Sequence, residues 1–255
     1  FGSSVGTLQL QRGVGTSTNG AGAFGASINL STDRMSDAAY VGLSNSFGSF
    51  KTRKHTVTFS TGPISNQFEL SGRLSKIDSD GYIDRASSDL KSYFLQGIFR
   101  DENTQIKALA FGGFERTYQS WFGIDETTLK TNRTYNPAGE NYDSEGNVIG
   151  FYEDQVDNYN QDHYQVHWEQ AVNAYWSLAL GLNYTYGRGY YQELNDIWYD
   201  QNIGFSGNTS ANYLQLPQTD AVDTENITQK WLDNDFYVAN LMAAFEKGTQ
   251  KLNLG

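Results

Sequence analysis

The stretch whose residue types first suggest chemistry is residues 11–32, QRGVGTSTNGAGAFGASINLST. Five of its first fifteen residues are glycines, and glycine-rich loops bind phosphate groups through their backbone amides. A Walker-type loop needs Lys and then Ser or Thr directly after its last glycine, and no Gly-Lys pair occurs here. A dinucleotide fingerprint also fails, because after Gly13 and Gly15 its third glycine position holds Thr18. The sequence therefore argues against a phosphate-binding loop.

The same stretch ends in a pattern that is typical of a strand. Ile28 and Leu30 alternate with Asn29 and Ser31, which is the two-residue period of a strand rather than that of a helix. Glycine permits positive φ and close approach of backbones, so the preceding glycines are interpreted as tight turns that lead into this strand.

The rest of the sequence offers little catalytic or metal chemistry. The chain has no cysteine, which excludes disulfides, thiolate metal sites and cysteine nucleophiles. His163 and His167 are predicted on one face of a strand, about 13 Å apart, which is too far to bind one metal ion. No H-E-x-x-H motif occurs. We therefore predict that the protein is not an enzyme and has no catalytic metal.

Two oxygen-rich segments raise the question of a calcium ion in the long connections. Residues 141–147 (NYDSEGN) and 233–236 (DNDF) carry the carboxylate and amide oxygens that Ca²⁺ binds. The carboxylates of Asp154 and Asp157 are interpreted as solvated or loop-capping rather than catalytic. No other cofactor is expected.

The composition favours a sheet with one apolar and one polar face. Aromatic residues make up 15% of the 255 residues, yet the mean hydropathy is −0.57. The net charge of −11 argues against a nucleic-acid partner, because residues 51–55 (KTRKH) are the one visible basic cluster. No run of about 18 apolar residues is present, which excludes a membrane helix, whereas strands of alternating polarity can cross a membrane as a closed barrel.

Alternation is clearest in residues 175–187, YWSLALGLNYTYG. The even-numbered positions from Trp176 to Tyr186 are aromatic or Leu, and the odd-numbered positions between them are small or polar. Successive side chains of a strand point to opposite faces, so one face is predicted to meet lipid and the other a polar interior. Strands are predicted at residues 40–47, 55–62, 66–77, 90–100, 105–121, 162–172, 175–187 and 236–247, with a ninth beginning at 251. Residues 93–99 and 106–114 are apolar on both faces and are given no orientation.

The connections between these strands alternate in length. Short links around residues 61–66, 101–104, 172–175 and 247–250 alternate with longer links at about 48–54, 78–89, 122–160 and 188–235. In an antiparallel sheet all the short links then lie at one end and all the long ones at the other, as in barrels with periplasmic turns and extracellular loops. Because bacterial barrels have even strand numbers, we expect the chain to be the early part of a larger barrel.

The predicted strands after residue 32 allow a second interpretation of residues 11–32, as the end of a domain that precedes a barrel. These residues resemble the end of the plug domain of TonB-dependent outer-membrane transporters, in which an Arg-Gly pair and a Ser-rich link lead to an AIGG-INI-T pattern. The matching residues are Arg12, Gly13, Ser17, Gly20, Ala23, Phe24, Gly25, Ile28, Asn29 and Thr32. Ala26 departs from a second Gly that is common in the family, and Asn19 departs from Tyr.

Further segments resemble members of this family from Bacteroidetes-type bacteria, at residues 79–89, 112–124, 134–140, 157–168, 184–193 and 230–237. The resemblance implies an all-β fold, in which residues 1–33 are the C-terminal end of the plug domain. Residues 34–255 would form the first part of a transmembrane antiparallel β-barrel, about nine of roughly 22 strands, with long extracellular loops at about 122–160 and 188–235.

The implied function is energy-coupled import of a scarce nutrient complex, such as a ferric siderophore, haem or cobalamin, across the outer membrane of a Gram-negative bacterium. The implied partners are this small ligand, membrane lipid and the TonB-ExbB-ExbD system, which the plug would reach through an N-terminal segment missing from this chain. Within the plug motif, Arg12 is expected to pair with an inward carboxylate such as Glu115 or Glu169.

Aromatic residues near the predicted extracellular ends are the candidates for ligand contact, because polar loops rarely carry so many. They are Tyr118, Trp121, Phe122, Tyr152, Tyr159, Tyr190, Tyr191, Trp198, Tyr199 and Trp231. The alternative role for each is the outer aromatic girdle of the barrel or packing within a loop.

Two other functions stay open at this point. One is a small, complete outer-membrane barrel with a structural or adhesion role, which predicts a gene of about this length. The other is a soluble β-sandwich enzyme or glycan-binding module, which predicts purification without detergent.

Overall fold

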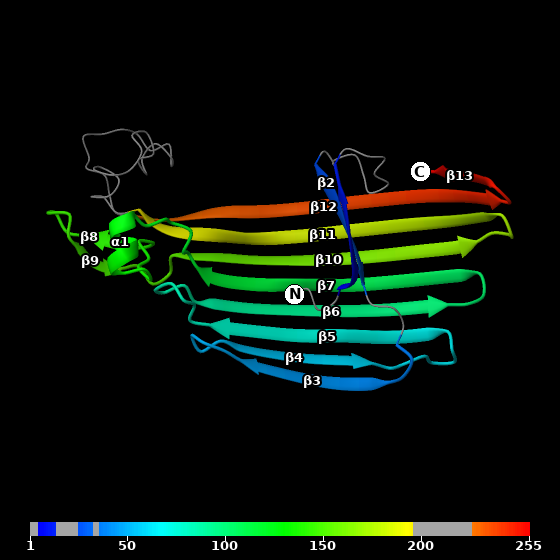
Figure 1. Cartoon of the computed structure of the whole chain (residues 1–255), viewed down its shortest axis with the longest axis horizontal. Helices are drawn as coiled ribbons and strands as arrows, with labels where there is room; N and C mark the ends of the chain where they lie inside the picture. Colours follow the sequence, from blue (N-terminus) through cyan, green and yellow to red (C-terminus); the bar gives the residue numbers. More distant parts are fainter. Residues whose placement is uncertain (1–4, 14–24, 33–35, 196–225) are drawn as a thin grey trace.

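A computed structural model of the chain describes residues 5–13, 25–32, 36–195 and 226–255. Its main feature is a nine-stranded antiparallel sheet with the strand order β13-β12-β11-β10-β7-β6-β5-β4-β3 (Figure 1). The strands are β3 (Tyr40–Phe47), β4 (Arg53–Ser60), β5 (Phe68–Ser79), β6 (Ser88–Arg100), β7 (Thr104–Tyr118), β10 (Val156–Ala171), β11 (Trp176–Asn195), β12 (Asn226–Lys247) and β13 (Gln250–Leu254). The predicted all-β antiparallel fold is thus confirmed, and the sheet is open, since β3 and β13 each pair on one side.

Three predicted strand ends are wrong by six residues or more, all at the same end of the sheet. β10 begins at Val156, whereas the predicted start was residue 162. β11 ends at Asn195 rather than at residue 187, and β12 begins at Asn226 rather than at residue 236. The extra residues are largely polar on both faces, so no alternation of hydropathy marks them, although the backbone ladder continues. The two longest connections are correspondingly 119–155 and 196–225, the second of which lies outside the described residues.

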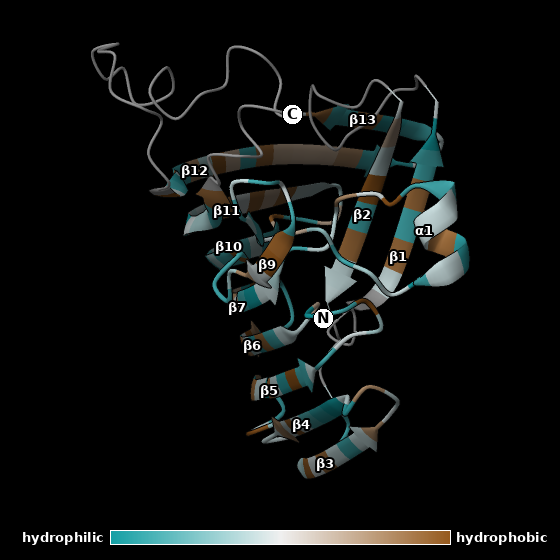
Figure 2. Cartoon of the chain, turned by 90° about the vertical axis from the view of Figure 1, so that its left-hand side faces the viewer, coloured by the Kyte–Doolittle hydropathy of each residue, from teal (hydrophilic) through white to brown (hydrophobic). Residues whose placement is uncertain are grey.

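A separate two-stranded ribbon precedes the sheet. It consists of β1 (Val5–Arg12) and β2 (Ala26–Thr32), and β2 is the strand predicted at the end of the glycine-rich stretch. Leu8 pairs with Leu30 and Leu10 with Ile28 across the ribbon. The ribbon crosses the large sheet on its concave side (Figures 1 and 2). The limits of residues 1–33 and 34–255 as two domains stay a prediction.

The connection between β7 and β10 contains three elements that the sequence did not predict. They are the helix α1 (Glu126–Thr131) and the hairpin of β8 (Glu140–Tyr142) and β9 (Val148–Phe151). Asp125 caps α1, because its carboxylate accepts hydrogen bonds from the amides of Thr127 and Thr128. No helix within the described ranges is long and apolar enough to cross a membrane.

The two faces of the sheet have the reverse of the usual polarity. We call the concave face that carries Glu69, Gln96 and Lys107 the inner face and its opposite the outer face. Glu69 and Gln96 are each only 1% exposed, whereas Tyr237 and Leu241 on the outer face are 72% and 62% exposed. Apolar side chains therefore cover the outer face, as predicted from the alternation, and most side chains of the inner face are polar or small.

The structure also orients the two strands for which the sequence pattern was ambiguous. Phe94 and Ile98 of β6 and Leu109 of β7 lie buried on the inner face, 9%, 3% and 5% exposed. Leu95 of β6 and Ile106 of β7 lie on the outer face and are 42% and 38% exposed. Both faces of these strands are apolar because the inner face is itself covered here, close to the ribbon.

Candidate functional site

The ribbon is attached to the inner face where β2 ends. The hydroxyl of Thr32 donates to Oε1 of Gln96 at 2.9 Å, and Nζ of Lys107 donates to the same hydroxyl at 2.7 Å. Gln96 and Lys107 come from β6 and β7, which are paired in the sheet. The inner face thus offers a donor and an acceptor to the last residue of the ribbon.

A second attachment involves the buried carboxylate of Glu69 on β5. It accepts hydrogen bonds from the amide of Ser36 at 3.1 Å and from the hydroxyls of Ser36 and Ser60 at 2.8 and 2.6 Å. Hydrogen bonds to an ionised carboxylate are stronger than those between neutral groups. Glu69 therefore fixes the chain between the ribbon and β3 to the wall formed by β4 and β5.

The sequence did not single out Glu69, Gln96 or Lys107. In the sequence, Glu69 is recognisable only as a carboxylate at an inward position of a strand. Glu115 and Glu169 are carboxylates at inward positions too, so the sequence does not show which of the three anchors the ribbon. Neither Glu115 nor Glu169 is paired with Arg12, which is exposed and has no ion pair with either carboxylate among the described residues. The expected pairing of Arg12 is not found.

The plug-motif residues lie at the turn end of the ribbon and within β2. Gly13 adopts a positive φ of 84°, and its amide donates to the carbonyl of Gly25 at 2.8 Å, which closes the ribbon at this end. Ile28 and Asn29 are paired with residues of β1. Gly20, together with Ser17, Ala23 and Phe24, lies outside the described residues.

Residues 119–155, which we call the cap, fold back onto the ends of the strands. Asn136 is 1% exposed, and its Nδ2 donates to the carbonyls of Asp84 and Gln119 at 3.0 and 2.9 Å. Its Oδ1 accepts from the amide of Ala138 at 3.0 Å. One buried side chain thus joins the middle of the cap to the turn between β5 and β6 and to the first residue of the cap, Gln119.

Arg85 supplies a second clamp from the same turn. Its guanidinium carbon lies 3.5 Å from the centre of the Phe151 ring, and its Nη2 donates to the carbonyl of Asn136. The backbone of Arg85 has a φ of 61°, in the left-handed region. A cation over an aromatic face in a desolvated place is stabilising, so Arg85 holds β9 against the turn.

Tyr118, a predicted ligand contact, is instead part of this packing. It is 7% exposed, and its hydroxyl lies 2.9 and 2.8 Å from the carbonyls of Ala138 and Tyr152. Gly139 has a φ of 77°, and a Cβ there would lie 2.6 Å from the Tyr118 hydroxyl. Tyr152 is also engaged, since its hydroxyl accepts from Nε2 of Gln192 at 2.6 Å.

Three of the predicted aromatic residues gather beside the inner face at the long-connection end. Trp121 of the cap lies edge-on to Tyr191 of β11, with ring centres 6.0 Å apart, and Phe122 lies 6.4 Å from Trp121. Trp121 is 58% exposed. Tyr159 of β10 lies on the same face of the sheet, and its hydroxyl donates to Oδ1 of Asn234 at 2.8 Å.

Two other predicted residues lie on the outer face. Tyr190 and Trp231 pair across β11 and β12 with ring centres 4.8 Å apart, and Arg188 lies over Trp231 at 5.2 Å. The structure therefore does not bring all the predicted aromatic residues into one site. Trp198 and Tyr199 lie outside the described residues.

Two carboxylates face the interior beside Tyr159 and Tyr191. Glu115 of β7 is paired in register with Tyr159, and Asp157 of β10 with Tyr191. Burial raises the pKa of Asp157 above its ordinary value, and burial together with the negative charge of Asp157 raises the pKa of Glu115. Lys230, across from Tyr191 on β12, bonds to Glu193 at 2.9 Å. This part of the wall is aromatic and acidic.

The two oxygen-rich segments differ in their local structure. Asp233 and Asp235 lie within β12, on the face opposite to Asn234, rather than in a loop. The Asp143 carboxylate accepts hydrogen bonds from the amides of Glu145 and Asn147, both at 2.9 Å. Among the described residues no three His, Cys, Asp or Glu side chains are grouped so as to hold a metal ion.

Solved structures with the same fold are receptors for iron complexes. The chain aligns with the siderophore receptor PiuA from Acinetobacter baumannii at a TM-score of 0.67 and 12% identity, covering 96% of this chain and 33% of that one. It aligns with BauA, the ferric preacinetobactin receptor of the same species, at a TM-score of 0.64 and 14% identity, covering 96% of this chain and 34% of that one. It aligns with the ferric-catecholate import receptor Fiu of E. coli K12 at a TM-score of 0.60 and 14% identity, covering 95% of this chain and 37% of that one.

These likenesses show the fold of the chain, and they extend over about a third of each receptor, as the covered shares of 33%, 34% and 37% indicate. No protein-family model matches the chain, and no curated protein matches its sequence.

Proposed function

We propose that the chain is part of a TonB-dependent outer-membrane receptor that imports a nutrient complex. The observation that carries this proposal is the reversed polarity of the sheet, with exposed Leu, Phe and Tyr on the outer face and buried Glu, Gln and Arg on the inner face. Water on both faces would make such an apolar outer surface a strong aggregation hazard. Lipid outside and a polar plug inside stabilise both faces.

The length of the apolar band supports a membrane span. On β11 the outward residues are apolar from Trp176 to Tyr184, which is nine residues and matches the 9–11 residues of a tilted transmembrane strand. Tyr164, Tyr184 and Tyr237 stack across three strands at one edge of this band. Tyrosine is enriched at membrane–water interfaces, so this row marks the boundary on the side of the long connections.

The ribbon then takes the role of the end of the plug. It lies against the inner face and is held there by Thr32 and Ser36. We infer that TonB-ExbB-ExbD moves the plug of the full-length protein against these contacts. The solved neighbours bind ferric siderophores, which supports a ferric complex as the first cargo to test, ahead of haem and cobalamin.

Within the predicted aromatic set, Trp121, Phe122, Tyr159 and Tyr191 are the proposed contacts for the cargo. They lie on the interior side at the proposed extracellular end, and Trp121 is half exposed. Tyr190 and Trp231 face outward and pack against each other six residues beyond Tyr184, which fits the alternative role of packing within the extracellular part rather than contact with cargo.

The decisive experiment combines localisation with transport. A strain that lacks the gene is grown under iron limitation, and uptake of radiolabelled ferric siderophores is compared with uptake of haem and cobalamin. We expect the protein in the outer-membrane fraction and a loss of uptake for one class of complex, restored by the full-length gene. Normal uptake of all three classes by the deletion strain would contradict the import function.

An adhesion role has one observation in its favour, because the cap exposes Leu129, Val148 and Ile149, the last of them to 65%. Such a role predicts that the purified protein binds a surface or a protein partner and that deletion leaves nutrient uptake unchanged. The uptake assay therefore separates the two functions.

A further inference from the structure

Two glycines of β11 shape an aromatic surface on the inner face. Tyr159 of β10 is paired in register with Gly189, and a Cβ at Gly187 or Gly189 would collide with the Tyr159 side chain. The Tyr159 hydroxyl reaches beyond β11 and donates to Oδ1 of Asn234 on β12 at 2.8 Å. The ring therefore lies down across β11, where the two glycines leave room for it, and its far side faces the interior.

Two carboxylates without a cationic partner flank this ring. Glu115 of β7 is paired in register with Tyr159, and Asp157 lies two residues along β10 on the same face. Neither forms an ion pair with a described residue. The charge of Asp157 contributes to the raised pKa of Glu115, so the two negative charges repel each other. A positive charge placed between them relieves this repulsion.

The basic side chains at this level of the sheet are neutralised or distant. Lys230 of β12 bonds to Glu193 at 2.9 Å. Lys54 of β4 lies in the same cross-strand row as Glu115 but three strands away, about 14 Å, which exceeds the screening length of about 8 Å at physiological ionic strength. The basic residues of β6, β7 and β11 here point to the outer face and form ion pairs there, Lys91 with Asp89, Arg116 with Asp154 and Arg188 with Asp233.

The long connections add to the negative charge at this end of the sheet. Residues 119–155 contain seven carboxylates and two basic residues, residues 196–225 contain five carboxylates and no basic residue, and residues 80–87 contain two carboxylates and one arginine. The first two connections together hold almost all of the net charge of −11. A surface of one sign raises the local concentration of ions of the opposite sign and speeds their association.

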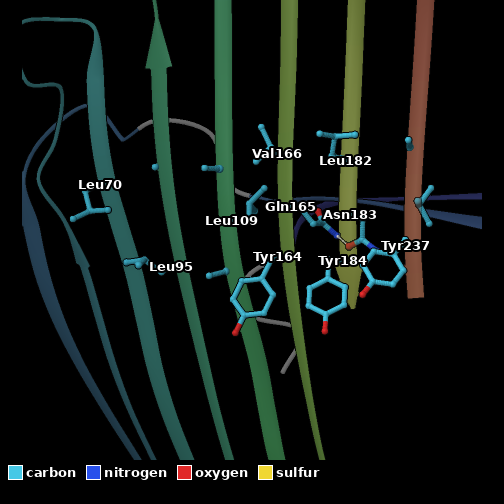
Figure 3. Close-up of a pocket in the computed structure, with 15 residues that line it drawn as sticks. Leu70, Leu95, Leu109, Tyr164, Gln165, Val166, Leu182, Asn183, Tyr184 and Tyr237 are labelled. Carbon is cyan, nitrogen blue, oxygen red and sulfur yellow. Dashed lines mark hydrogen bonds between the residues drawn. The ribbon is translucent and has the colours of Figure 1, made fainter. Parts of the chain in front are cut away.

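The surface around Tyr159 lies outside the apolar band and is hollowed. Tyr164, Tyr184 and Tyr237 lie side by side at the edge of that band (Figure 3), and Tyr159 is five residues, about 17 Å, beyond Tyr164. A hollow of about 580 Å³ on the inner face is lined by Tyr159 and Glu115. A charged ligand can therefore approach both groups from water.

We propose that the cargo of this receptor carries a positive charge, on an ammonium or guanidinium group that lies between Glu115 and Asp157 and contacts the ring of Tyr159. Aromatic faces attract cations, and in the same wall Nζ of Lys230 lies 5.0 Å from the centre of the Tyr191 ring. A ferric tris-catecholate carries three negative charges and is repelled here, whereas a ferric trihydroxamate core is neutral and a pendant ammonium makes it cationic. This inference rests on the proposed import function and deepens it by assigning the charge of the cargo.

The test compares the binding of three ferric complexes to the full-length protein in detergent. The probes are ferrioxamine B, a trihydroxamate complex with a free ammonium group; its N-acetyl derivative, which has the same core without that charge; and ferric enterobactin, a tris-catecholate. We expect ferrioxamine B to bind about tenfold more tightly than its acetylated form, because one charge meets two carboxylates, and ferric enterobactin to bind most weakly. An equal or reversed preference between the first two, or tightest binding of the third, would overturn the inference.

The double variant Glu115→Gln/Asp157→Asn isolates the two carboxylates. We expect it to reduce the tenfold preference to about twofold. Glu169→Gln is the matched control and should preserve the preference, since Glu169 lies on the same face at the other end of β10. A loss of folded protein affects both probes alike and leaves their ratio unchanged. An unaltered ratio in the double variant, or an equal fall in the control, would overturn the site.

A second measurement needs no cargo and uses Trp121, which is 58% exposed and lies edge-on to Tyr191. The difference in fluorescence between the wild type and Trp121→Phe gives the quenching of this residue by caesium and by iodide, each relative to free tryptophan. We expect caesium to be favoured and the double variant to narrow the difference. If none of the three complexes binds, this preference for caesium supports the inference, and its absence overturns it.

Uptake in cells separates this inference from the proposed function. Uptake of an anionic ferric complex that depends on the gene would leave the receptor function intact and overturn the charge of the cargo alone. Normal uptake of every complex by the deletion strain would contradict the receptor function and the inference with it.

Discussion

Glu69 is the residue that links the inner wall most directly to the chain behind the ribbon. Its side chain receives three short hydrogen bonds, from the amide and hydroxyl of Ser36 and from the hydroxyl of Ser60. For Glu169, on the same face, the described part of the chain provides one hydrogen bond to its side chain, from Nε2 of Gln105 at 3.5 Å. The number of donors, rather than the charge itself, distinguishes a carboxylate that fixes the ribbon from one that lines the wall.

We expect Glu69→Ala to loosen the chain between the ribbon and β3. A hydrogen bond to a charged group contributes about 1.5–3 kcal/mol, and Ser36 loses its bonds to this carboxylate. Hydrogen exchange of the full-length protein should then show faster exchange of the Ser36 amide. Glu169→Ala is the control and should leave this amide unchanged. Equal protection of Ser36 in both variants would contradict the assigned role.

The Asp157 carboxyl should make the stability of the protein depend on pH. Burial raises its pKa in the folded protein, so the folded state binds this proton more tightly than the unfolded chain, whose value is about 3.9. The free energy of unfolding therefore decreases as the pH rises from about 4 through the raised pKa of Asp157 in the folded protein, because Asp157 loses its proton over this range. Asp157→Asn should reduce this decrease, as measured by urea unfolding in detergent at a series of pH values.

The control for Asp157→Asn is Glu153→Gln, since Glu153 is exposed and lies four residues away. It should leave the pH dependence of stability unchanged. The Asp157→Asn variant should also lower the pKa of Glu115, because the charge of Asp157 contributes to its raised value. An unaltered pH profile in the Asp157 variant would show that this carboxyl is solvated in the folded protein.

At the scale of elements, the cap is a folded unit with its own buried contacts. It contains α1 and the β8–β9 hairpin, and it is held to the turn between β5 and β6 by Asn136 and Arg85. Tyr118, Ala138 and Val156 form a small apolar cluster beneath it. The long connection is therefore ordered by local packing, and the ligand candidate Trp121 is carried on a defined support.

Asn136→Ala should unfold the cap while leaving the sheet in place. The substitution removes three hydrogen bonds and leaves the buried carbonyls of Asp84 and Gln119 without this donor, at a cost of about 2–4 kcal/mol. Limited proteolysis should then cut within residues 119–155, and the nine-stranded sheet should remain intact. Lys130→Ala, on the exposed face of α1, should not change the cleavage pattern.

Strands were predictable from the sequence where their two faces meet different surroundings. The strand at 175–187 was found because Leu180 and Leu182 face outward while Gly181 and Asn183 face inward. Its continuation to Asn195 was not found, because Tyr190 and Tyr191 point to opposite faces with similar polarity. Hydrogen-bonded ladders extend through such segments without leaving a hydropathy pattern.

The contacts of the site were less predictable than the strands, since they depend on neighbours far apart in the sequence. Thr32 reaches Gln96 and Lys107, which are 64 and 75 residues away. Tyr118 had the aromatic character of a ligand contact, but its hydroxyl is used by the cap. Residue type identified the candidates, and packing decided which of them face the interior.

For the whole molecule, the reversed polarity of the two faces explains the polar composition. A polar mean hydropathy of −0.57 is compatible with a membrane location because the apolar side chains are concentrated on one face. A closed barrel hides both edges of a sheet, whereas β3 and β13 each have one unpaired edge within the described chain. Within the described chain the sheet is open, and the ribbon lies against its concave face without being enclosed by it.

An adjacent pair of substitutions on β11 tests the placement of the two faces. Leu180 lies at the middle of the apolar band on the outer face, and Ala179 lies on the inner face opposite Glu169. An arginine on the lipid face at mid-membrane costs about 2–4 kcal/mol, whereas an arginine beside an inward carboxylate meets a polar surface. We expect Leu180→Arg to reduce the amount of full-length protein that folds into liposomes and Ala179→Arg to leave it near the wild-type level. The measurement is the folded fraction by heat-modifiable gel migration. Equal folding of the two variants would contradict the assignment of the outer face to lipid, and the receptor proposal would fail with it.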